Sequence, residues 1–455
     1  MLVSTKPPGP RNPLLAYAAL YRDPLGYLVG AARKYGDIVH LTIANRHDFL
    51  LNHPDYIRTI LLDQDGTRRS VHRPLQRILG RGLLTSRGKI HRKQRALLQP
   101  VFQKHCIAAL GEVMRREIVR CSDRWQDGAT VEMTEEMTRL AISTAGKTLF
   151  NVDLESEEIE VRDALVTVFA ATRFNNLLLV SKFLERLPLP ANRRFRRAAR
   201  RLDQFIFKMI ADRRARPTDQ PDLLSVLVRL SRAKPRMMTD QKIRDQILTF
   251  FLAGHETIAS ALTWTWYLLA KNPDATEKLN IELDKALNGR LPEVSDLDSL
   301  SYARMVFAES MRIYPPVWII GRLAQRDVDL DGYIIPKGSY VHVSQFLMHR
   351  DARYFPDPER FDPERWTSEA AAARPRFSYF PFGGGGLQCI GEGFAWTQGL
   401  LTIAILASRW RMRLVPGHRI ELEPQITLRP RYGIPMTLER RNCSGVNCEE
   451  QRTKE

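Results

Sequence analysis

The chain has 455 residues, of which 44% are hydrophobic and 26% are charged. These proportions are those of a globular protein, and they exclude collagen, a coiled coil or a disordered chain as a description of the whole. Lysine and arginine outnumber aspartate and glutamate by 69 to 51, a net charge of +18, which favours an acidic protein, a nucleic acid or an anionic membrane as partner.

Cysteine content and hydrophobic runs indicate in which cellular compartment the protein is expected. Five cysteines are too few and too scattered for a disulfide framework, so a reducing compartment is favoured. Residues Met1–Pro13 contain no apolar stretch of signal-peptide length. The longest apolar run, Ile247–Ala270, contains Glu256, and a charge at mid-bilayer costs roughly 2.5–3.5 kcal/mol. We therefore expect a cytoplasmic protein without a transmembrane anchor.

The first two thirds of the chain are predicted to be mainly helical after one hairpin. Asp37–Asn52 has short hydrophobic runs around Ala44–Arg46, a pattern typical of a β-hairpin. Helical spacing then recurs in Ile107–Trp125, Glu135–Phe150, Glu157–Ala171 and Phe195–Arg214. Thr239 is a suitable N-cap for a helix of roughly 32 residues that ends near Pro273 and would be about 48 Å long. Because this helix is apolar on most faces, we expect it in the middle of the fold.

The last third of the chain differs in that it contains several short predicted strands. Short strands are predicted at Val328–Leu330, Tyr333–Ile335, Tyr340–Val343, Met412–Val415 and Ile426–Leu428. The polar, charged tail Arg441–Glu455 is expected to be disordered. With no repeat and no Gly/Ser-rich linker, we predict one domain over residues 1–440, mainly α (α+β), with small sheets.

The most unusual local sequence is the cysteine loop, Phe380–Gly391, which reads FPFGGGGLQCIG. Four consecutive glycines let the backbone approach a neighbour closely. A phosphate cradle is disfavoured because the Gly-Lys-Ser/Thr ending is absent. The other interpretation is metal ligation by Cys389, whose pKa would be lowered by the N–H groups that begin the following helix. A lone cysteine is more often a small buried hydrophobic residue, so the neighbours must decide.

Those neighbours form a specific pattern, Phe-x-x-Gly-x-x-x-Cys-x-Gly, which resembles the haem-binding signature of the cytochrome P450 family. The resemblance implies that Cys389 is the axial thiolate ligand of the iron of haem b, a ligand that favours O–O cleavage. It also implies that Phe382, Gly383 and Gly391 contact the cofactor. The family fold that it implies is a single, mostly helical, triangular domain with small sheets.

The loop departs from the family at Leu387, where an Arg or His usually pairs with a haem propionate. Losing such a charge-assisted hydrogen bond would cost about 1.5–3 kcal/mol. His91 and Arg95 lie one helical turn apart, and they resemble the family's haem-edge pair. Arg322 resembles a further propionate-binding position. Each cation alone is as well explained by solvation, but together they would offset the charge missing at Leu387.

A second motif resembles the family's Glu-x-x-Arg pair and its later arginine. Glu309 and Arg312 share a helix face, and Arg360 follows in Pro-Glu-Arg-Phe. The resemblance implies a triad that secures the fold below the haem. The alternative is an ordinary solvated pair worth about 0.2–0.5 kcal/mol.

The long helix carries a third motif, Ala-Gly-His-Glu-Thr, at Ala253–Thr257. Glu256 and Thr257 resemble the family's acid–alcohol pair that delivers protons during dioxygen cleavage, and small Ala253 and Gly254 leave room for a flat ring or dioxygen. The alternative has Thr257 bonded to a carbonyl one turn earlier and Glu256 in a surface ion pair. The expected substrate-pocket residues are Phe250, Ala253, Gly254, Val317, Trp318 and Ile434.

The resemblance covers Pro7–Arg440 and implies a monooxygenase. Such an enzyme inserts one atom of O2 into a small apolar substrate such as a fatty acid, terpenoid or steroid. No Gly-x-Gly-x-x-Gly follows a strand, so electrons from NAD(P)H should arrive through a separate ferredoxin and ferredoxin reductase. A haem-thiolate peroxygenase, an isomerase or dehydratase, and a nonenzymatic haem sensor remain as alternatives.

The positive charge is concentrated in Ala191–Pro217, where nine Arg and one Lys stand against two Asp, so ten minus two gives +8 in 27 residues. Apolar residues at helical spacing in this segment indicate an amphipathic helix with a solvated basic face, and a nucleic-acid partner is not favoured. Contact of this face with anionic lipid is one hypothesis. The remaining surplus could serve an acidic ferredoxin behind Cys389.

Overall fold

The structure is a computed structural model that describes residues 7–43, 46–70, 73–153, 190–218 and 222–441, together with 164, 167 and 168. Most of the helix expected at Glu157–Ala171 and all of the tail after Arg441 lie outside these residues. Of the helices in the described ranges, none combines the length and the hydrophobicity that crossing a membrane requires.

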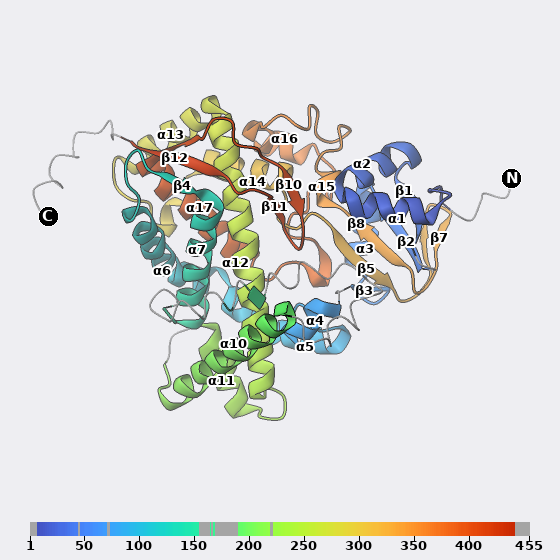
Figure 1. Ribbon diagram of the computed structural model, residues 1–455, viewed down its shortest axis with the longest axis horizontal. Coiled ribbons are helices and arrows are strands. Elements are labelled where there is room, and N and C mark those ends of the chain that lie inside the picture. Colours follow the sequence, from blue (N-terminus) through green and yellow to red (C-terminus); the bar gives the residue numbers. More distant parts are fainter. Residues whose placement is uncertain are drawn as a thin grey trace, which may run out of the picture.

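Helices account for more than half of the residues that the structure describes (Figure 1). They are α1 (Pro13–Arg22), α2 (Pro24–Tyr35), α3 (Pro54–Leu62), α4 (Arg73–Leu79), α5 (Gly88–Leu98), α6 (Lys104–Asp123), α7 (Met133–Ala145), α10 (Pro190–Ala215), α11 (Leu223–Ala233), α12 (Asp240–Lys271), α13 (Pro273–Leu287), α14 (Ser301–Ile313), α15 (Gln345–Met348), α16 (Ser368–Ala372) and α17 (Glu392–Arg409). Short helical turns are η1 (Gln99–Phe102), η2 (Gly146–Phe150), η3 (Val294–Asp296), η4 (Pro363–Trp366) and η5 (Gly385–Leu387).

The strands are short and form small sheets. They are β1 (Ile38–Ile43), β2 (Arg46–Leu51), β3 (Thr67–Arg69), β4 (Thr130–Glu132), β5 (Ile320–Ala324), β6 (Val328–Leu330), β7 (Tyr333–Ile335), β8 (Tyr340–Val343), β9 (Trp410–Leu414), β10 (Leu422–Pro424), β11 (Leu428–Pro430) and β12 (Pro435–Arg440). The largest sheet has the order β1-β2-β8-β5-β3, and the others are β4-β12-β9, β10-β11 and β6-β7.

Helix α12 runs through the middle of the molecule, with α6, α7 and α17 on one side and the five-stranded sheet on the other (Figure 1). Thr239 caps it by accepting a hydrogen bond from the backbone N–H of Lys242, and the helix ends before Pro273. Most of its side chains are buried, and it belongs to the large hydrophobic cluster that forms the main core. The prediction of a central apolar helix of 32 residues is therefore confirmed.

Most sequence-based strands are also confirmed. The hairpin at Asp37–Asn52 is β1 paired with β2, in a register that sets Ile38 opposite Leu51. The strand expected at Ile426–Leu428 lies two residues further along, as β11, because a turn is closed between Gln425 N–H and Thr427 C=O. Helices and small sheets are segregated, as expected for an α+β fold.

Arg441 is the first residue of the tail that was expected to be disordered. Its backbone N–H donates to the Arg409 carbonyl, and its guanidinium forms an ion pair with Asp284. Arg441 itself is thus held by the fold, and the residues after it lie outside the described part of the chain.

Candidate active site

The cysteine loop contains η5, leads directly into α17 and is held by its own backbone. The N–H of Cys389 donates to the carbonyl of Phe382 over 2.9 Å. Gly385 adopts a positive φ of 67°, and a Cβ there would meet the Leu61 carbonyl oxygen of α3 at 2.2 Å. A side chain is therefore excluded at Gly385 by both backbone conformation and packing.

Cys389 combines two properties that indicate an internal space. Its side chain is accessible by surface area, yet enough protein surrounds it that burial raises the pKa of its thiol, an effect only partly opposed by the Gly391 N–H. The expectation that the helix start alone lowers this pKa is therefore wrong, because desolvation of the thiolate outweighs the N–H group. A bound metal cation would reverse this balance, since a coordinating thiol is deprotonated.

Basic side chains converge near this thiol. Arg95 donates to the Gln388 carbonyl over 2.6 Å, and His91 is buried one turn away on α5. Burial, with the charges of Arg69, Arg95 and Arg92, lowers the pKa of His91 to about 4. The positive charge of Arg95 is in turn felt at the Cys389 sulfur. Arg95 of the expected pair thus faces the cysteine loop, whereas His91 lies one turn away and, with its lowered pKa, is uncharged at neutral pH.

Two arginines face each other on neighbouring strands beside this pair. Arg322, on β5, is directly opposite Arg69, on β3, in an antiparallel register. Burial lowers the pKa of Arg322 to about 9 and that of Arg69 to about 10, and each is affected by a positively charged neighbour. Arg69 was missed from the sequence, because a strand of three residues, Thr67–Arg69, gives no recognisable pattern.

The middle of α12 faces an accessible space. Between Ile243 and Leu269 the side chains that are not buried are those of Ala253, Gly254 and Thr257, which share one face of the helix. A Cβ added to Gly254 would meet only the Leu149 side chain, at 3.9 Å. This space therefore lies against the positions expected to leave room for a ring.

An aromatic pair connects α12 to the cysteine loop. Phe250 is buried and stacks on Phe102 of η1, with ring centroids 5.3 Å apart. A Cβ added to Gly391 would lie 4.0 Å from both Phe102 and the Cys389 sulfur. Phe102 therefore bridges the two halves of the site, and Phe250 supports it from the core.

The acid–alcohol pair has specific partners. The Thr257 hydroxyl donates to the Ala253 carbonyl over 2.7 Å. Glu256 is 1% exposed; it forms an ion pair with Arg429 of β11 at 2.9 Å and accepts a hydrogen bond from the Thr427 hydroxyl. The hydrogen bond proposed as the alternative for Thr257 is present, whereas the ion pair of Glu256 is buried rather than at the surface.

The Glu-x-x-Arg motif forms a fully buried ion pair, but the third residue is not the one expected. Arg312 donates twice to Glu309, and both side chains are 0% exposed. Arg365 of η4 is the further cation, 3.5 Å from Glu309. Arg360 is exposed and contributes only its carbonyl, which accepts from Arg312. The assignment of Arg360 is therefore wrong, because the second Pro-Glu-Arg sequence, Pro363–Arg365, docks on the carboxylate.

The expected pocket residues differ in their surroundings. Val317 is half-buried, and Trp318 donates its indole N–H to the Gln425 carbonyl while packing on the N-terminal helices. Ile434 is 0% exposed within the main core, so its assignment to the pocket is wrong. Ile426, which precedes Thr427 in the turn between β10 and β11, is half-buried.

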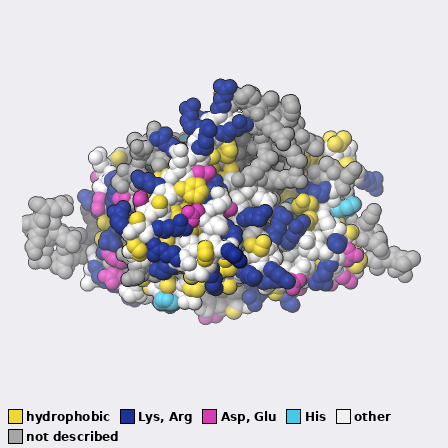
Figure 2. Space-filling model, turned by 90° about the horizontal axis from the view of Figure 1, so that it is seen from below, with side chains coloured by type: hydrophobic (Ala, Val, Ile, Leu, Met, Phe, Trp, Pro, Cys, Tyr) yellow, Lys and Arg dark blue, Asp and Glu magenta, His cyan; other side chains and the backbone are white. Residues whose placement is uncertain are grey.

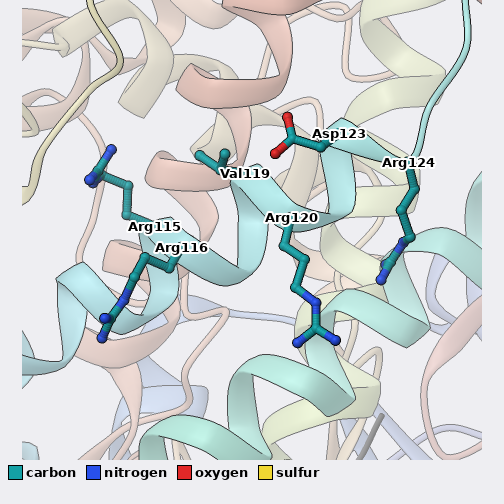
Figure 3. A pocket seen from close by; sticks show the side chains of 6 residues that line it. All are labelled: Arg115, Arg116, Val119, Arg120, Asp123 and Arg124. Atoms are coloured by element: carbon teal, nitrogen blue, oxygen red, sulfur yellow. The ribbon is translucent and has the colours of Figure 1, made fainter. Parts of the chain in front are cut away.

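Of two surface hollows, one lies away from the expected site and the other adjoins the cysteine loop. One of about 360 Å³ lies on α6 and is lined by Arg115, Arg116, Val119, Arg120, Asp123 and Arg124 (Figure 3). None of the residues expected at the site lines it. A second, of about 210 Å³, is formed by the cysteine loop with Arg376, Tyr379, Glu392 and Trp396.

The residues of the site fit haem b. His91 Nε2 and Arg322 Nε are buried without a hydrogen-bond partner in the described structure, and buried polar groups normally have one. The described ion pairs give no carboxylate to Arg69, Arg95 or Arg322. A group with two carboxylates and a metal beside a thiol would satisfy both deficits.

Comparison with known proteins places the chain in a family. Residues 7–434 match the family model described as Cytochrome P450. Cyclooctatin synthase of Streptomyces melanosporofaciens is 38% identical over 424 residues, 91% of this chain and 92% of that protein. Cyclooctat-9-en-7-ol 5-monooxygenase of the same organism is 35% identical over 89% of both chains. Pentalenene oxygenase of Streptomyces avermitilis is 33% identical over 89% of this chain and 90% of that protein. The chain therefore belongs to the cytochrome P450 family.

The fold agrees with this membership. The haem domain of cytochrome P450DA superposes with a TM-score of 0.85 over 97% of this chain and 99% of that one, at 23% identity. As a member of the family the protein is a haem b monooxygenase: it inserts one oxygen atom of O2 into an apolar substrate and receives electrons from NAD(P)H through redox partners.

Proposed function

We propose that Cys389 is the axial thiolate ligand of the haem and that Arg95, His91 and Arg322 bind its propionates. The observation that carries the proposal is an accessible thiol within the protein, surrounded by cations that have no carboxylate among the described residues. When bound, haem supplies the activation of O2, which a thiolate ligand favours. Phe382 holds the Cys389 N–H through its carbonyl, and the Gly391 N–H stabilises the thiolate.

The test is the spectrum of the reduced protein with carbon monoxide. We expect the strongly red-shifted Soret band of haem-thiolate proteins, and we expect Cys389→Ser to abolish it. Cys106→Ser, at a half-buried cysteine of α6, is the matched control and should leave the band unchanged. A band at the shorter wavelength of histidine-ligated haem in the parent protein would refute the ligand assignment.

Protons would be delivered from α12. Thr257 presents a hydroxyl to the accessible face, and Glu256 lies next to it in sequence, held by Arg429 and Thr427. We infer that the Glu256 carboxylate, when it leaves Arg429, relays protons through water to the Thr257 side of the space. The Arg429 ion pair and the Thr427 hydrogen bond fix the starting position of this carboxylate.

The substrate that we propose is a terpenoid. Two relatives are named for cyclooctat-9-en-7-ol and pentalenene. The accessible face of α12 offers Ala253, Gly254 and Thr257, with half-buried Ile426 on the neighbouring hairpin. An apolar ligand that displaces water from the iron converts the iron from low to high spin, and the Soret band shifts as a result. A panel of terpenoids, fatty acids and steroids should shift it most with terpenoids. A response to fatty acids alone would contradict this assignment.

The proposed electron donor is an acidic ferredoxin, with its reductase. While His91 and Arg95 face inward, α5 exposes Lys89, Arg92 and Lys93 on its outer side. Opposite charges on a partner would steer association and make it sensitive to salt. We expect Lys93→Glu to slow ferredoxin-dependent reduction, whereas Lys208→Glu, an exposed lysine of α10, should not. Equal rates in both variants would contradict docking at α5.

The compartment and surface contacts are also proposed. A cytoplasmic location is supported by Cys106, Cys121 and Cys389, which are free, and subcellular fractionation tests it. Many Lys and Arg side chains lie on the face seen from below, among hydrophobic and other groups (Figure 2). Arg193, Arg197 and Arg200 are exposed on α10. We propose peripheral contact with anionic lipid there. Co-sedimentation with vesicles that is independent of anionic lipid would count against it.

A further inference from the structure

The cross-strand pair formed by Arg69 and Arg322 needs a counterion. The two residues are directly opposite each other in the antiparallel β3–β5 pair. Like charges in this arrangement destabilise a sheet. Both guanidinium groups also lie within the protein, where burial lowers the pKa of each. An arrangement of this kind is stable when an anion lies between the two cations.

Hydrogen bonds fix the Arg69 side chain next to the anomalous position of the cysteine loop. Its Nη1 donates to the Leu84 carbonyl over 2.9 Å, and its Nη2 donates to the carbonyl of Leu387 over 3.2 Å. Leu387 is the residue that replaces the expected propionate-binding cation. The guanidinium of Arg69 therefore lies against the backbone of the position where a charge is missing from the sequence.

Arg69 retains donors for a ligand. An arginine has five N–H donors, and the two carbonyls are the hydrogen-bond partners that the described structure gives to Arg69. Its charge is felt at the Cys389 sulfur, at His91 and at Arg322. The side chain is thus close to every other basic group of the site.

We propose that Arg69 binds a haem propionate in place of the cation that Leu387 lacks, and that it shares this carboxylate group with Arg322. The proposal rests on haem ligation by Cys389. A guanidinium recognises a carboxylate through paired N–H groups, so one propionate between two strands would turn the repulsion between Arg69 and Arg322 into two attractive contacts. The absence of a basic side chain at residue 387 is then compensated from β3.

The test is the transfer of haem from the holoenzyme to excess apomyoglobin. We expect Arg69→Leu to accelerate haem loss roughly tenfold or more. The matched control is Arg68→Leu on the same strand, where alternation directs the side chain to the other face of the sheet; it should leave the rate within about twofold of the parent. Adding Leu387→Arg to the Arg69→Leu variant should restore slow haem loss.

A second measurement separates charge from structure. Removing a positive charge near the iron should make its midpoint potential more negative in Arg69→Leu, whereas Arg69→Lys should keep the potential close to that of the parent. If Arg69→Leu does not fold, Arg69→Lys still tests the proposal, because one ammonium cannot replace the paired N–H groups and should accelerate haem loss by a smaller factor.

The outcomes are distinguishable. Haem loss from Arg69→Leu at the parental rate, or equal acceleration in Arg68→Leu, would overturn the role of Arg69. Failure of the double variant to slow haem loss would overturn compensation between residues 69 and 387. A parent protein without the red-shifted carbon monoxide band would instead overturn the ligand assignment of Cys389, independently of the arginine.

Discussion

Two buried clusters of charge in this protein differ in how completely they are satisfied. In the first, all five N–H donors of Arg312 are used: two go to Glu309 and three to backbone carbonyls. Glu309 also accepts from the Asp362 N–H and the Trp366 indole. In the second, formed by Arg69, His91, Arg95 and Arg322, buried nitrogen atoms lack partners and the described ion pairs include no carboxylate.

This difference separates a structural cluster from a ligand-binding one. A buried ion pair that is saturated with hydrogen bonds is complete within the chain, and removing one member leaves an uncompensated charge. A cluster of cations with unused donors is complete only when an anion binds. The same residue types therefore have opposite roles, and the presence or absence of a carboxylate among the described partners distinguishes them.

The largest expected effect comes from the satisfied cluster. Arg312→Leu leaves Glu309 buried without its main partner and should lower the free energy of unfolding by about 3–5 kcal/mol. Arg322→Leu should leave the helical fold nearly unchanged and release haem instead. Denaturant titration followed by far-ultraviolet circular dichroism and by Soret absorbance checks both. The distinction between the two clusters is wrong if Arg322→Leu lowers the denaturation midpoint measured by circular dichroism as much as Arg312→Leu does.

A third buried ion pair joins Glu256 to Arg429. Like the first cluster it is paired within the chain, yet it lies beside the accessible face of α12. Glu256→Gln removes the proton carrier and should slow substrate oxidation about 10²-fold, or about 2.7 kcal/mol in activation free energy. The solvent deuterium isotope effect on kcat should increase. Glu369→Gln, at an exposed residue of α16, is the control. An unchanged kcat would assign Glu256 to the structural class.

The corrected third member of the first cluster can be tested by paired variants. Arg365→Leu removes the cation 3.5 Å from Glu309 and should destabilise the fold by about 2 kcal/mol. Arg360→Leu removes only an exposed side chain and should change stability by about 0.5 kcal/mol or less. If both variants lost the same stability in chemical denaturation, Arg360 would have to be assigned to the cluster after all.

The second cluster should also give stability a pH dependence. In haem-depleted protein the pKa of His91 is about 4, below its ordinary value of about 6.5. Between these pH values the unfolded chain binds more protons, so the free energy of unfolding falls as pH falls through this window, by at most about 1.4 kcal/mol per pH unit. His91→Gln should remove this contribution, and His105→Gln, exposed on α6, should not. Parallel stability curves for the parent and His91→Gln would contradict it.

The sequence by itself determined the features that depend on local spacing. The N-cap and apolar pattern of α12, the β1–β2 hairpin and the Glu309–Arg312 pair follow from helix and strand periodicity. The cysteine loop carries a pattern specific enough to indicate the family. These features are read from residues a few positions apart, which is why they could be predicted.

Tertiary structure decided which distant residues meet. Two Pro-Glu-Arg sequences follow one another, and only packing selects Arg365 over Arg360 for Glu309. Strand register brings Arg69 opposite Arg322, and desolvation, which depends on the whole surroundings, raises the pKa of Cys389. Burial and register sum contributions from many segments, so the balance of charge at the site is set by the fold rather than by any local motif.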